Sequence, residues 1–322
     1  MLVPVLLFLL GLVLLIKGGD WFVDGAAGIA QRFHVPELII GATVVSIGTT
    51  LPEVMVSATS AVSGHGEIAY GNAIGSIICN TALIAAITAA VRPGPVNAKS
   101  LKMPVLFFFI SAVAYAAVAY TTGYFSRWFG VVLLGIFLTY MILTVRHGLK
   151  NPEAQKEEEP SHGEAKGLGR EILLLVVGAA VIAVGANLLV DNGTLIAQAL
   201  GVPESVIALT FVALGTSLPE LVTAITSLVK GHGSLSLGNV IGANIFNLVL
   251  VSGVSTVLAP FHIPQSSTLF GHNASLVLDI PLMMIVMAIL TLPALARKKL
   301  SRVQGIVLLL IYAAFCVVQF TM

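Results

Sequence analysis

Charged residues are scarce in this chain. Asp, Glu, Lys and Arg make up only 10% of its 322 residues, whereas 57% of the residues are hydrophobic, a balance far from that of soluble domains. The formal net charge is +1, so nothing in the composition indicates a nucleic-acid partner or a strongly acidic one. The chain is therefore predicted to lie in a lipid bilayer.

Cysteine is also scarce, and the marks of a removable signal peptide are missing. Cys79 and Cys316 both fall in apolar stretches and share no motif, so we interpret them as core residues rather than as a disulfide or a metal-binding pair. The N-terminal stretch lacks a basic n-region and a small-residue cleavage site, and we interpret it as the first membrane helix. No pattern indicates a cofactor or an obligatory protein partner.

Long apolar windows, by contrast, fill most of the sequence. A helix needs about 20 mostly apolar residues to cross a bilayer. Ten windows meet this condition: 2–30, 36–62, 67–91, 103–120, 127–146, 171–198, 203–229, 235–259, 275–296 and 302–321. One long polar insert, 148–169, has the composition of a solvated linker. The sequence predicts an all-α membrane protein with a five-helix repeat at 1–147 and a second one at 170–322.

The two halves of the chain also resemble each other. Residues 24–80 align with residues 191–247 without a gap, so that VPELIIGATVVSIGTTLPE in the first half matches VPESVIALTFVALGTSLPE in the second. Because each half has an odd number of crossings, the second half enters the membrane from the opposite face. Inverted repeats are typical of secondary transporters, which bind their substrates near the bilayer midplane between the repeats.

Lys and Arg are distributed unevenly over the loops. With the N-terminus outside, 14 of the 16 basic residues fall in inside loops, Arg127 falls in an outside loop, and Lys17 lies within the first span. Cytoplasmic loops carry an excess of Lys and Arg. We therefore expect both termini outside the cell, the linker 148–169 in the cytoplasm, and a location in the prokaryotic plasma (inner) membrane.

Two six-residue strings, one in each half, interrupt the apolar pattern. Residues 48–53 read GTTLPE and residues 215–220 read GTSLPE. Each proline removes a backbone N–H and clashes with the carbonyl four residues earlier, so we expect broken helices in which the carbonyls of Gly48 and Gly215 are free. At membrane depth such backbone is tolerated only when it is buried in protein or lines a wet cavity. Free carbonyls in such a place can bind a cation.

Each string also places one carboxylate at membrane depth. Thr49 and Glu53 are four residues apart, as are Thr216 and Glu220, so each pair shares a helical face. An ionised carboxylate at the bilayer centre costs at least ~2.5 kcal/mol, and two of them require a compensating cation. Calcium binds about six to eight oxygens from carboxylates, carbonyls and hydroxyls. A lone Thr or Glu is explained by packing or ion pairing, but neither explanation predicts the same string in both halves.

Spans 3 and 8 carry a second repeated string. Ser76 and Asn80 share a helical face at a spacing of four residues, and Ala243 and Asn247 occupy the equivalent places in span 8. Four glycines form small-xxx-small pairs, which let helices approach closely and need no role as ligands: Gly71, Gly75, Gly238 and Gly242.

The paired GT(T/S)LPE and GN(A/V)IG strings resemble the α-repeats of the cation/calcium exchanger superfamily, in particular its prokaryotic sodium/calcium exchanger branch. The resemblance implies an antiporter that exchanges Na⁺ for Ca²⁺ by alternating access, with spans 1 and 6 sliding against a bundle of spans 2, 3, 7 and 8. It implies that Ser46 and Ala213 contribute backbone carbonyls to the ion site. It also implies the side-chain ligands: Thr49, Thr50, Glu53, Ser76, Asn80, Thr216, Ser217, Glu220 and Asn247.

This chain departs from the family pattern in span 8. Family members often have Ser where this chain has Ala243, and some archaeal members have Asp where it has Asn247. The site therefore has a formal charge of −2 from Glu53 and Glu220, which one calcium ion balances.

Three other functions are weighed against sodium/calcium exchange. A calcium/proton antiporter of the same superfamily carries a glutamate within the GNA string, whereas residues 71–75 read GNAIG. An intramembrane hydrolase requires a base, but no His or Lys lies at helical spacing from Ser217 and no G-x-S-x-G string is present. In a passive channel, two buried carboxylates would bind a divalent ion tightly and hinder conduction. No catalytic residue is therefore assigned.

Three aspartates lie along spans 1 and 6. Asp24 and Asp191 occupy equivalent positions in the two halves, and Asp20 precedes Asp24 by one helical turn. They could line an ion path, but we favour an interfacial position or pairing with Lys17.

Overall fold

The computed structural model describes residues 2–150, 167–200, 215–265 and 268–321, and most of them are helical. Nine helices within these ranges are long and apolar enough to cross a membrane: Leu2–Phe33, Glu37–Val62, Gly66–Val91, Ala98–Thr121, Arg127–Gly148, Leu168–Ile196, Gly233–Leu258, Ser275–Arg297 and Arg302–Gln319. Their ends agree with the predicted windows to within a few residues, and the all-α membrane fold is confirmed.

The remaining predicted span, 203–229, is described only in its second part. There a shorter apolar helix, α11 (Leu218–Val229), follows a turn at Thr216 and Ser217. Residues 201–214 lie outside the described residues, and with them the predicted carbonyl ligand Ala213.

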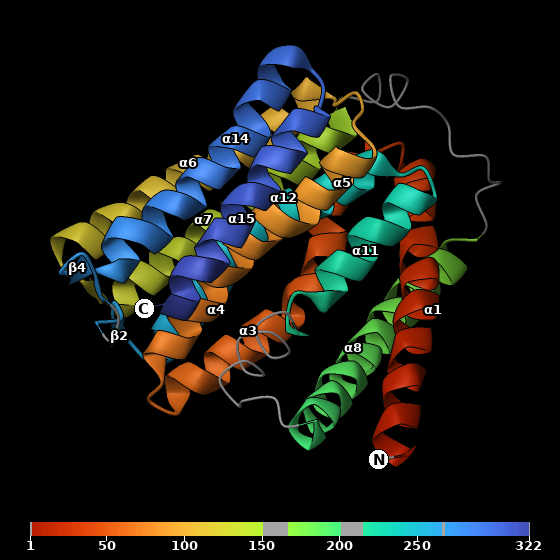
Figure 1. Cartoon of the computed structure of the whole chain (residues 1–322). Coiled ribbons are helices and arrows are strands. Elements are labelled where there is room, and N and C mark those ends of the chain that lie inside the picture. Colours follow the sequence, from red (N-terminus) through yellow and green to blue (C-terminus); the bar gives the residue numbers. More distant parts are fainter. Residues whose placement is uncertain (1, 151–166, 201–214, 266–267, 322) are drawn as a thin grey trace.

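Two long helices, α1 (Leu2–Phe33) and α8 (Leu168–Ala199), form an antiparallel pair at one side of the molecule, coloured red and green in Figure 1. Glycines let the two backbones touch. A Cβ atom at Gly25 would lie 2.6 Å from the backbone oxygen of Glu171, and one at Gly11 would lie 2.9 Å from the backbone oxygen of Gly185. Such contacts exclude larger side chains, so the pair is expected to move as one unit.

The centre of the molecule consists of two matching sets of helices (Figure 1). The first set comprises α2 (Glu37–Ile40), the π-helix η1 (Gly41–Val45), α3 (Ser46–Val62), α4 (Gly66–Cys79), the π-helix η2 (Asn80–Ala85) and α5 (Ala86–Val91). The second set comprises α11, α12 (Gly233–Phe246), the π-helix η5 (Asn247–Val251) and α13 (Ser252–Leu258). The repeat in the sequence therefore extends to the element bounds, since α4 and α12 are each 14 residues long and each is followed by a π-helix that begins at an asparagine.

The helix α12 packs tightly against η1 and α3 of the first set. Gly238 faces the backbone carbonyl of Leu38, and a Cβ atom at Gly242 would lie 2.6 Å from the Cα atom of Ala42. The close approach predicted for the glycine pair of span 8 is thus confirmed. It brings the polar residues of α12 next to those of α3. The same prediction is wrong for Gly71 and Gly75 of span 3, because a Cβ atom at either position would meet nothing within 4 Å.

The turns that connect the two helices of each hairpin also match. Gly64, between α3 and α4, has a φ angle of 85°, and Gly231, between α11 and α12, has a φ angle of 90°. Only glycine adopts this region without strain. This explains why the turn sequences 64–66 and 231–233, which both read Gly-His-Gly, begin with glycine.

The two prolines of the repeated strings behave differently. In the first half, α3 continues through Pro52 to Val62, and the irregular backbone lies earlier, in η1. The prediction of a broken helix at Pro52 is therefore wrong, although Pro52 still cannot donate a hydrogen bond to the carbonyl of Gly48. In the second half, Pro219 lies in the first turn of α11, where the missing N–H has no cost.

Four further helices lie on the side of the central sets away from α1 and α8 (Figure 1): α6 (Ala98–Thr121), α7 (Arg127–Lys150), α14 (Ile280–Arg297), which follows the π-helix η6 (Ser275–Asp279), and α15 (Arg302–Thr321). Large buried side chains fill the space between them and the centre, including Tyr115, Tyr140 and Phe246.

Two short antiparallel strand pairs, which the sequence did not predict, connect loops at the ends of these helices. The strand β1 (Tyr124–Phe125) pairs with β2 (Phe261–His262), and β3 (Thr268–Leu269) pairs with β4 (His272–Asn273).

Candidate functional site

The two repeated carboxylates lie together in the interior. Glu53 on α3 and Glu220 on α11 both have no exposed surface, and they interact electrostatically. The hydroxyl of Thr50 donates a hydrogen bond to Oε1 of Glu220 over 3.4 Å, which connects the two halves directly. The predicted meeting of the two GT(T/S)LPE strings is therefore seen in the structure.

Several buried polar atoms near these carboxylates lack hydrogen-bond partners among the described residues. They are both carboxylate oxygens of Glu53, Oε2 of Glu220, the hydroxyl of Ser217, and the side-chain amide atoms of Asn80 and Asn247. Buried polar groups of native proteins are almost always bonded. Carboxylate, hydroxyl and amide oxygens are ligands for hard cations, so this set of atoms, which we call the central site, has the chemistry of a cation-binding site.

Two π-helical turns position the amides of the central site. Asn80 is the first residue of η2, which packs against α11, and Asn247 is the first residue of η5, which packs against α3. Each amide therefore lies on a π-helix that packs against the glutamate-bearing helix of the other half. π-Helical turns occur frequently at functional sites, because they alter the direction of side chains within a helix.

The other predicted site residues are placed as follows. Thr49, Thr50, Ser76 and Ser217 are buried, and Thr216 is partly buried. The backbone carbonyl of Ser46 lies 3.5 Å from the hydroxyl of Thr49, farther than Oδ1 of Asn239 at 3.2 Å, which is the nearer acceptor for the single proton of that hydroxyl. Ser46 is predicted to bind the ion through its backbone carbonyl and not through its side chain. Its hydroxyl lies within hydrogen-bond distance of two other backbone carbonyls, those of Gly41 and Asn239.

Two asparagines that sequence reasoning overlooked contact the threonines of the strings. The Oδ1 atom of Asn239 on α12 accepts a hydrogen bond of 3.2 Å from Thr49, and Oδ1 of Asn72 on α4 accepts one of 3.2 Å from Thr216. The signal was present in the sequence, since both asparagines belong to the repeated GN(A/V)IG string.

The chain can now be compared with known proteins. The sequence profile of the sodium/calcium exchanger protein family matches residues 3–146 and 170–321. The chain belongs to this family. The sodium/calcium exchanger of Methanosarcina acetivorans is 32% identical over 98% of both chains. An uncharacterised membrane protein of Methanocaldococcus jannaschii is 36% identical over 95% of this chain and 94% of its own length.

A solved structure agrees with this assignment. The sodium–calcium exchanger NCX_Mj, soaked with Na⁺ and Sr²⁺, superposes on this chain with a TM-score of 0.81 at 34% identity, and the superposition covers 97% of each chain. The protein is thus a membrane transporter of the exchanger family and not an enzyme. Within the residues that the structure describes, no three His, Cys, Asp or Glu side chains gather into a metal centre.

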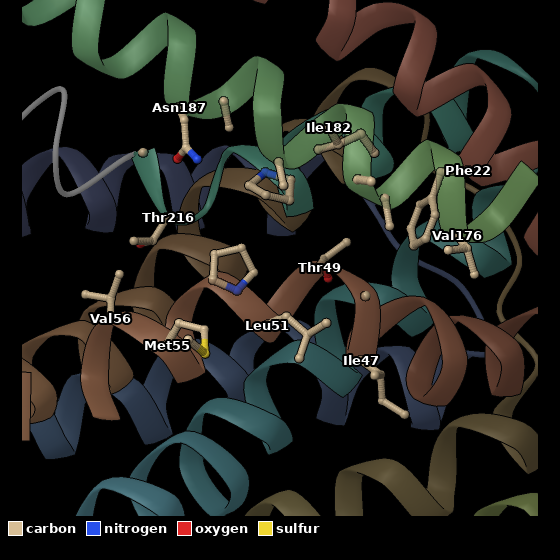
Figure 2. A pocket seen from close by; sticks show the side chains of 18 of the residues that line it. Phe22, Ile47, Thr49, Leu51, Met55, Val56, Val176, Ile182, Asn187 and Thr216 are labelled. Carbon is tan, nitrogen blue, oxygen red and sulfur yellow. The ribbon is translucent and has the colours of Figure 1, made fainter. Parts of the chain in front are cut away.

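A cavity of about 830 Å³ lies between α8 and the helices α3 and α11 of this exchanger. Figure 2 shows that Thr49 and Thr216 reach it from the side of the repeated strings, and Asn187 from α8. The lining is mainly apolar, and its polar residues on α8 are Asn187 and Asp191. Together with Thr49 and Thr216, these two residues provide the polar part of the lining. Asp191, which we interpreted as interfacial or paired, thus lines this cavity.

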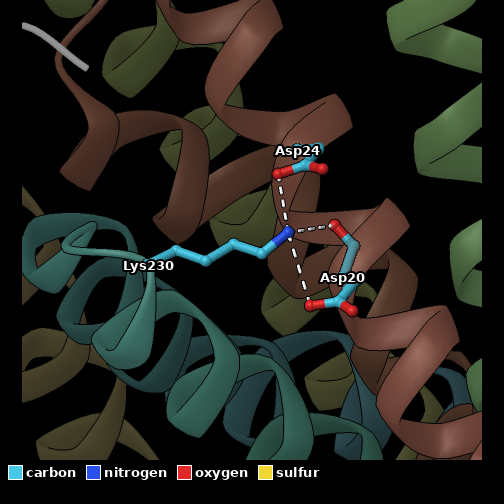
Figure 3. A network of polar contacts seen from close by, with 3 residues as sticks. All are labelled: Asp20, Asp24 and Lys230. Carbon is cyan, nitrogen blue, oxygen red and sulfur yellow. Dashed lines mark hydrogen bonds and ion pairs between the residues drawn. The ribbon is translucent and has the colours of Figure 1, made fainter. Parts of the chain in front are cut away.

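A second group of charges lies toward the end of the α1 and α8 pair that is farther from Asp191. Lys230, just after α11, forms an ion pair with Asp24 at 2.7 Å and with Asp20 at 3.4 Å, and it donates to the backbone carbonyl of Asp20 at 3.0 Å (Figure 3). Pairing of Asp20 and Asp24 with Lys17 is therefore wrong, because their partner is Lys230. We call these three residues the Lys230 cluster.

The packing of α1 against α8 places Asp191 and the Lys230 cluster toward different ends of the pair, and the cavity extends between them, because Phe22 and Leu175 also line it. Gly11 contacts Gly185, whereas Gly25 contacts Glu171. Asp24 therefore lies beside the beginning of α8, and Asp191 lies near its end. Further polar contacts gather at the Lys230 end: Arg32 with Glu171 at 3.2 Å, His232 with Glu37 at 2.7 Å, and Arg92 with the carbonyl of Leu228 at 2.7 Å.

Proposed function

We propose that this chain is a secondary active antiporter that exchanges Na⁺ for Ca²⁺ across the membrane by alternating access, and that the central site binds both ions in turn. The proposal includes two inverted repeats, 1–147 and 170–322, with both termini outside and the linker 148–169 in the cytoplasm of a prokaryotic cell. Membership of the sodium/calcium exchanger family supports the choice of ions, and the excess of basic residues in alternate loops supports the orientation.

The observation that carries the proposal is the buried pair of Glu53 and Glu220, one from each half, with oxygen atoms that lack partners among the described residues. Two ionised carboxylates in a low-dielectric interior require about two positive charges nearby. One Ca²⁺ ion supplies them, and so do two Na⁺ ions. Because either set of ions neutralises the same carboxylates, the two sets compete for one site, which is the basis of exchange.

The proposed ligand set includes this pair of carboxylates. Its members are Thr49, Thr50, Glu53, Ser76, Asn80, Thr216, Ser217, Glu220 and Asn247 through their side chains, and Ser46 and Ala213 through their carbonyls. In span 8, the methyl group of Ala243 offers no oxygen and Asn247 offers no charge. The negative charge of the proposed site therefore comes from the two glutamates alone.

Alternating access requires that the site opens to one side of the membrane at a time. The cavity between α8 and the repeated strings provides a route from the end of α8, while the Lys230 cluster holds α1 against the C-terminal end of α11. In the proposed orientation the end of the cavity at Asn187 and Asp191 faces outward, and the Lys230 cluster lies toward the cytoplasm. The pair of α1 and α8 would close the cavity by moving as a unit.

The test is calcium uptake into liposomes that contain the purified protein. Vesicles loaded with Na⁺ and diluted into Na⁺-free medium should accumulate calcium, and vesicles without a Na⁺ gradient should not. Uptake driven by a proton gradient in the absence of Na⁺ would indicate instead the calcium/proton antiporter. Uptake without any gradient of a counter-ion would indicate a passive channel.

A further inference from the structure

Asn72 and Asn239 connect the two halves in a crosswise manner. Asn72 of the first half accepts a hydrogen bond from Thr216 of the second, and Asn239 of the second half accepts one from Thr49 of the first, each over 3.2 Å. The two contacts join residues that are 144 and 190 positions apart in the chain, so neither is a by-product of local helix geometry.

We propose that Asn72 and Asn239 are positioning residues, which direct the hydroxyl protons of Thr216 and Thr49 away from the bound cation. A hydroxyl group has one proton and two lone pairs. A hydroxyl that binds a cation through its oxygen must point its proton elsewhere. An acceptor that lies outside the ligand set gives the proton a fixed direction and leaves the lone pairs for the ion. This inference rests on the proposed function, because it assumes that the threonines contact the ion.

The orientation of the Asn72 amide follows from its other contacts. Its Nδ2 atom donates to the backbone carbonyl of Glu53 at 3.2 Å and to the hydroxyl of Ser57 at 2.8 Å. A carbonyl can only accept, so the nitrogen must face Glu53 and the oxygen must face Thr216. One amide thus holds the backbone of a carboxylate string from one half and the hydroxyl of the string from the other.

Asn239 is held differently, although it occupies the equivalent position. Its side chain has no exposed surface, and its Oδ1 atom lies 3.2 Å from the hydroxyl of Thr49 and 3.4 Å from that of Ser46. The equivalent of Ser57 in the second half is Ala224, which has no hydroxyl, and Nδ2 of Asn239 lacks a partner among the described residues. Asn239 therefore acts as an acceptor for the hydroxyl groups of α3 and not as a donor.

This arrangement resembles the outer ligands of metal sites. Groups that bond to the ligands, rather than to the metal, fix the orientation of those ligands, and their loss typically reduces metal affinity by about 10–100-fold. Loss of either asparagine amide should therefore weaken calcium binding by roughly tenfold or more, even though neither side chain is a proposed ligand.

The test is a pair of double-mutant cycles on the full-length protein, with calcium affinity and sodium-driven calcium uptake as readouts. The variants are Asn239→Leu and Thr49→Val, singly and combined, and Asn72→Leu and Thr216→Val in the same way. We expect Asn239→Leu to weaken calcium binding in the native background and to have little further effect in the Thr49→Val background, because the oriented hydroxyl is already gone. In the Thr216→Val background its full effect should remain, and the converse should hold for Asn72→Leu.

A role that does not act through the threonines would give a different result. If the asparagines acted only through other contacts, such as those of Asn72 with Glu53 and Ser57, each substitution would weaken binding by the same factor in every background, and that outcome would overturn the inference. Asn192→Leu is the matched control, because Asn192 is a buried asparagine whose amide nitrogen donates to Leu188 within its own helix. It should leave calcium affinity unchanged.

The two independent cycles keep the test decisive if one leucine variant does not fold. Proteins are compared only when they elute as a single species and unfold at temperatures close to that of the native protein. The native protein also separates this inference from the proposed function. If it shows no sodium-driven calcium uptake, the proposed function fails. If it transports and both cycles lack the crosswise coupling, only the positioning role fails.

Discussion

The Lys230 cluster should bias the exchanger toward the state in which the cavity is accessible. Lys230→Gln removes the cation that joins α1 to the C-terminal end of α11 while keeping a side chain of similar length. In alternating access, opening the Lys230 end separates these elements and breaks the ion pairs. A contact that exists in one state only shifts the population toward that state by its own free energy.

The magnitude can be worked out from the geometry. Lys230 pairs with Asp24 at 2.7 Å and with Asp20 at 3.4 Å, and the side chains of these three residues are between 25% and 53% exposed. Partly exposed ion pairs contribute roughly 0.5 kcal/mol each after solvent screening. Two pairs therefore contribute about 1 kcal/mol, which corresponds to about a fivefold change in the ratio of the two states.

The assay is the rate at which a membrane-impermeant maleimide labels a cysteine at Asn187→Cys, in a chain that also carries Cys316→Ala. Asn187 lines the cavity (Figure 2), and the native Cys79 is buried. Lys230→Gln should slow the labelling, because it depletes the state in which the cavity is accessible.

Lys17→Gln provides the matched control for this measurement. It removes the same charge from an exposed position on α1 that forms no ion pair within the described part of the chain. Equal labelling rates in native and Lys230→Gln proteins would refute the reasoning, and so would an equal slowing by Lys17→Gln.

Three further predictions concern the central site. Thr49→Val or Thr216→Val should weaken calcium uptake less than loss of a glutamate charge, because each removes one neutral oxygen; equal losses in uptake assays would contradict this ranking. Protons and calcium compete for the same oxygens of Glu53 and Glu220, so the Kd for calcium should rise as the pH falls; a Kd that is constant from neutral to mildly acidic pH would argue against a carboxylate site. Exchange should run without potassium, because Asn247 provides no charge for a further monovalent ion, and Asn247→Asp should strengthen monovalent binding at the expense of turnover. A requirement for potassium in voltage-clamped flux measurements with the native protein would show that another residue supplies the charge.

The helices and the central carboxylates could be predicted from the sequence for physical reasons. An apolar window of about 20 residues in a bilayer folds as a helix, because the hydrocarbon core offers no water to hydrogen-bond the backbone N–H and C=O groups. The repeat placed Glu53 and Glu220 in equivalent strings, and the cost of burying two charges predicted that they share a cation. The burial of both carboxylates in the interior agrees with that prediction.

Other features depend on tertiary contacts that a sequence pattern does not contain. The continuation of α3 through Pro52 depends on support from neighbouring helices, which overrides the local tendency of proline to break a helix. The π-helical turns at Asn80 and Asn247 have no known sequence signature. Lys230 pairs with Asp24 across 206 positions, whereas sequence proximity favoured Lys17.

The asparagines of the GN strings represent an intermediate case. Both belong to the repeated string, but only the crosswise packing of α4 and α12 shows that they contact the threonines Thr216 and Thr49.

The central claim is that one carboxylate from each half holds the same calcium ion. The most direct test is the binding of radioactive calcium to the purified native protein and to the variants Glu53→Gln and Glu220→Gln, which keep the side-chain shape and each remove one negative charge. Sodium should displace the bound calcium from the native protein. The account predicts one calcium ion per native chain and a nearly complete loss of binding in either variant, because hard-cation affinity depends on the number of carboxylate ligands. Calcium bound with native affinity by either variant would show that the site lies elsewhere.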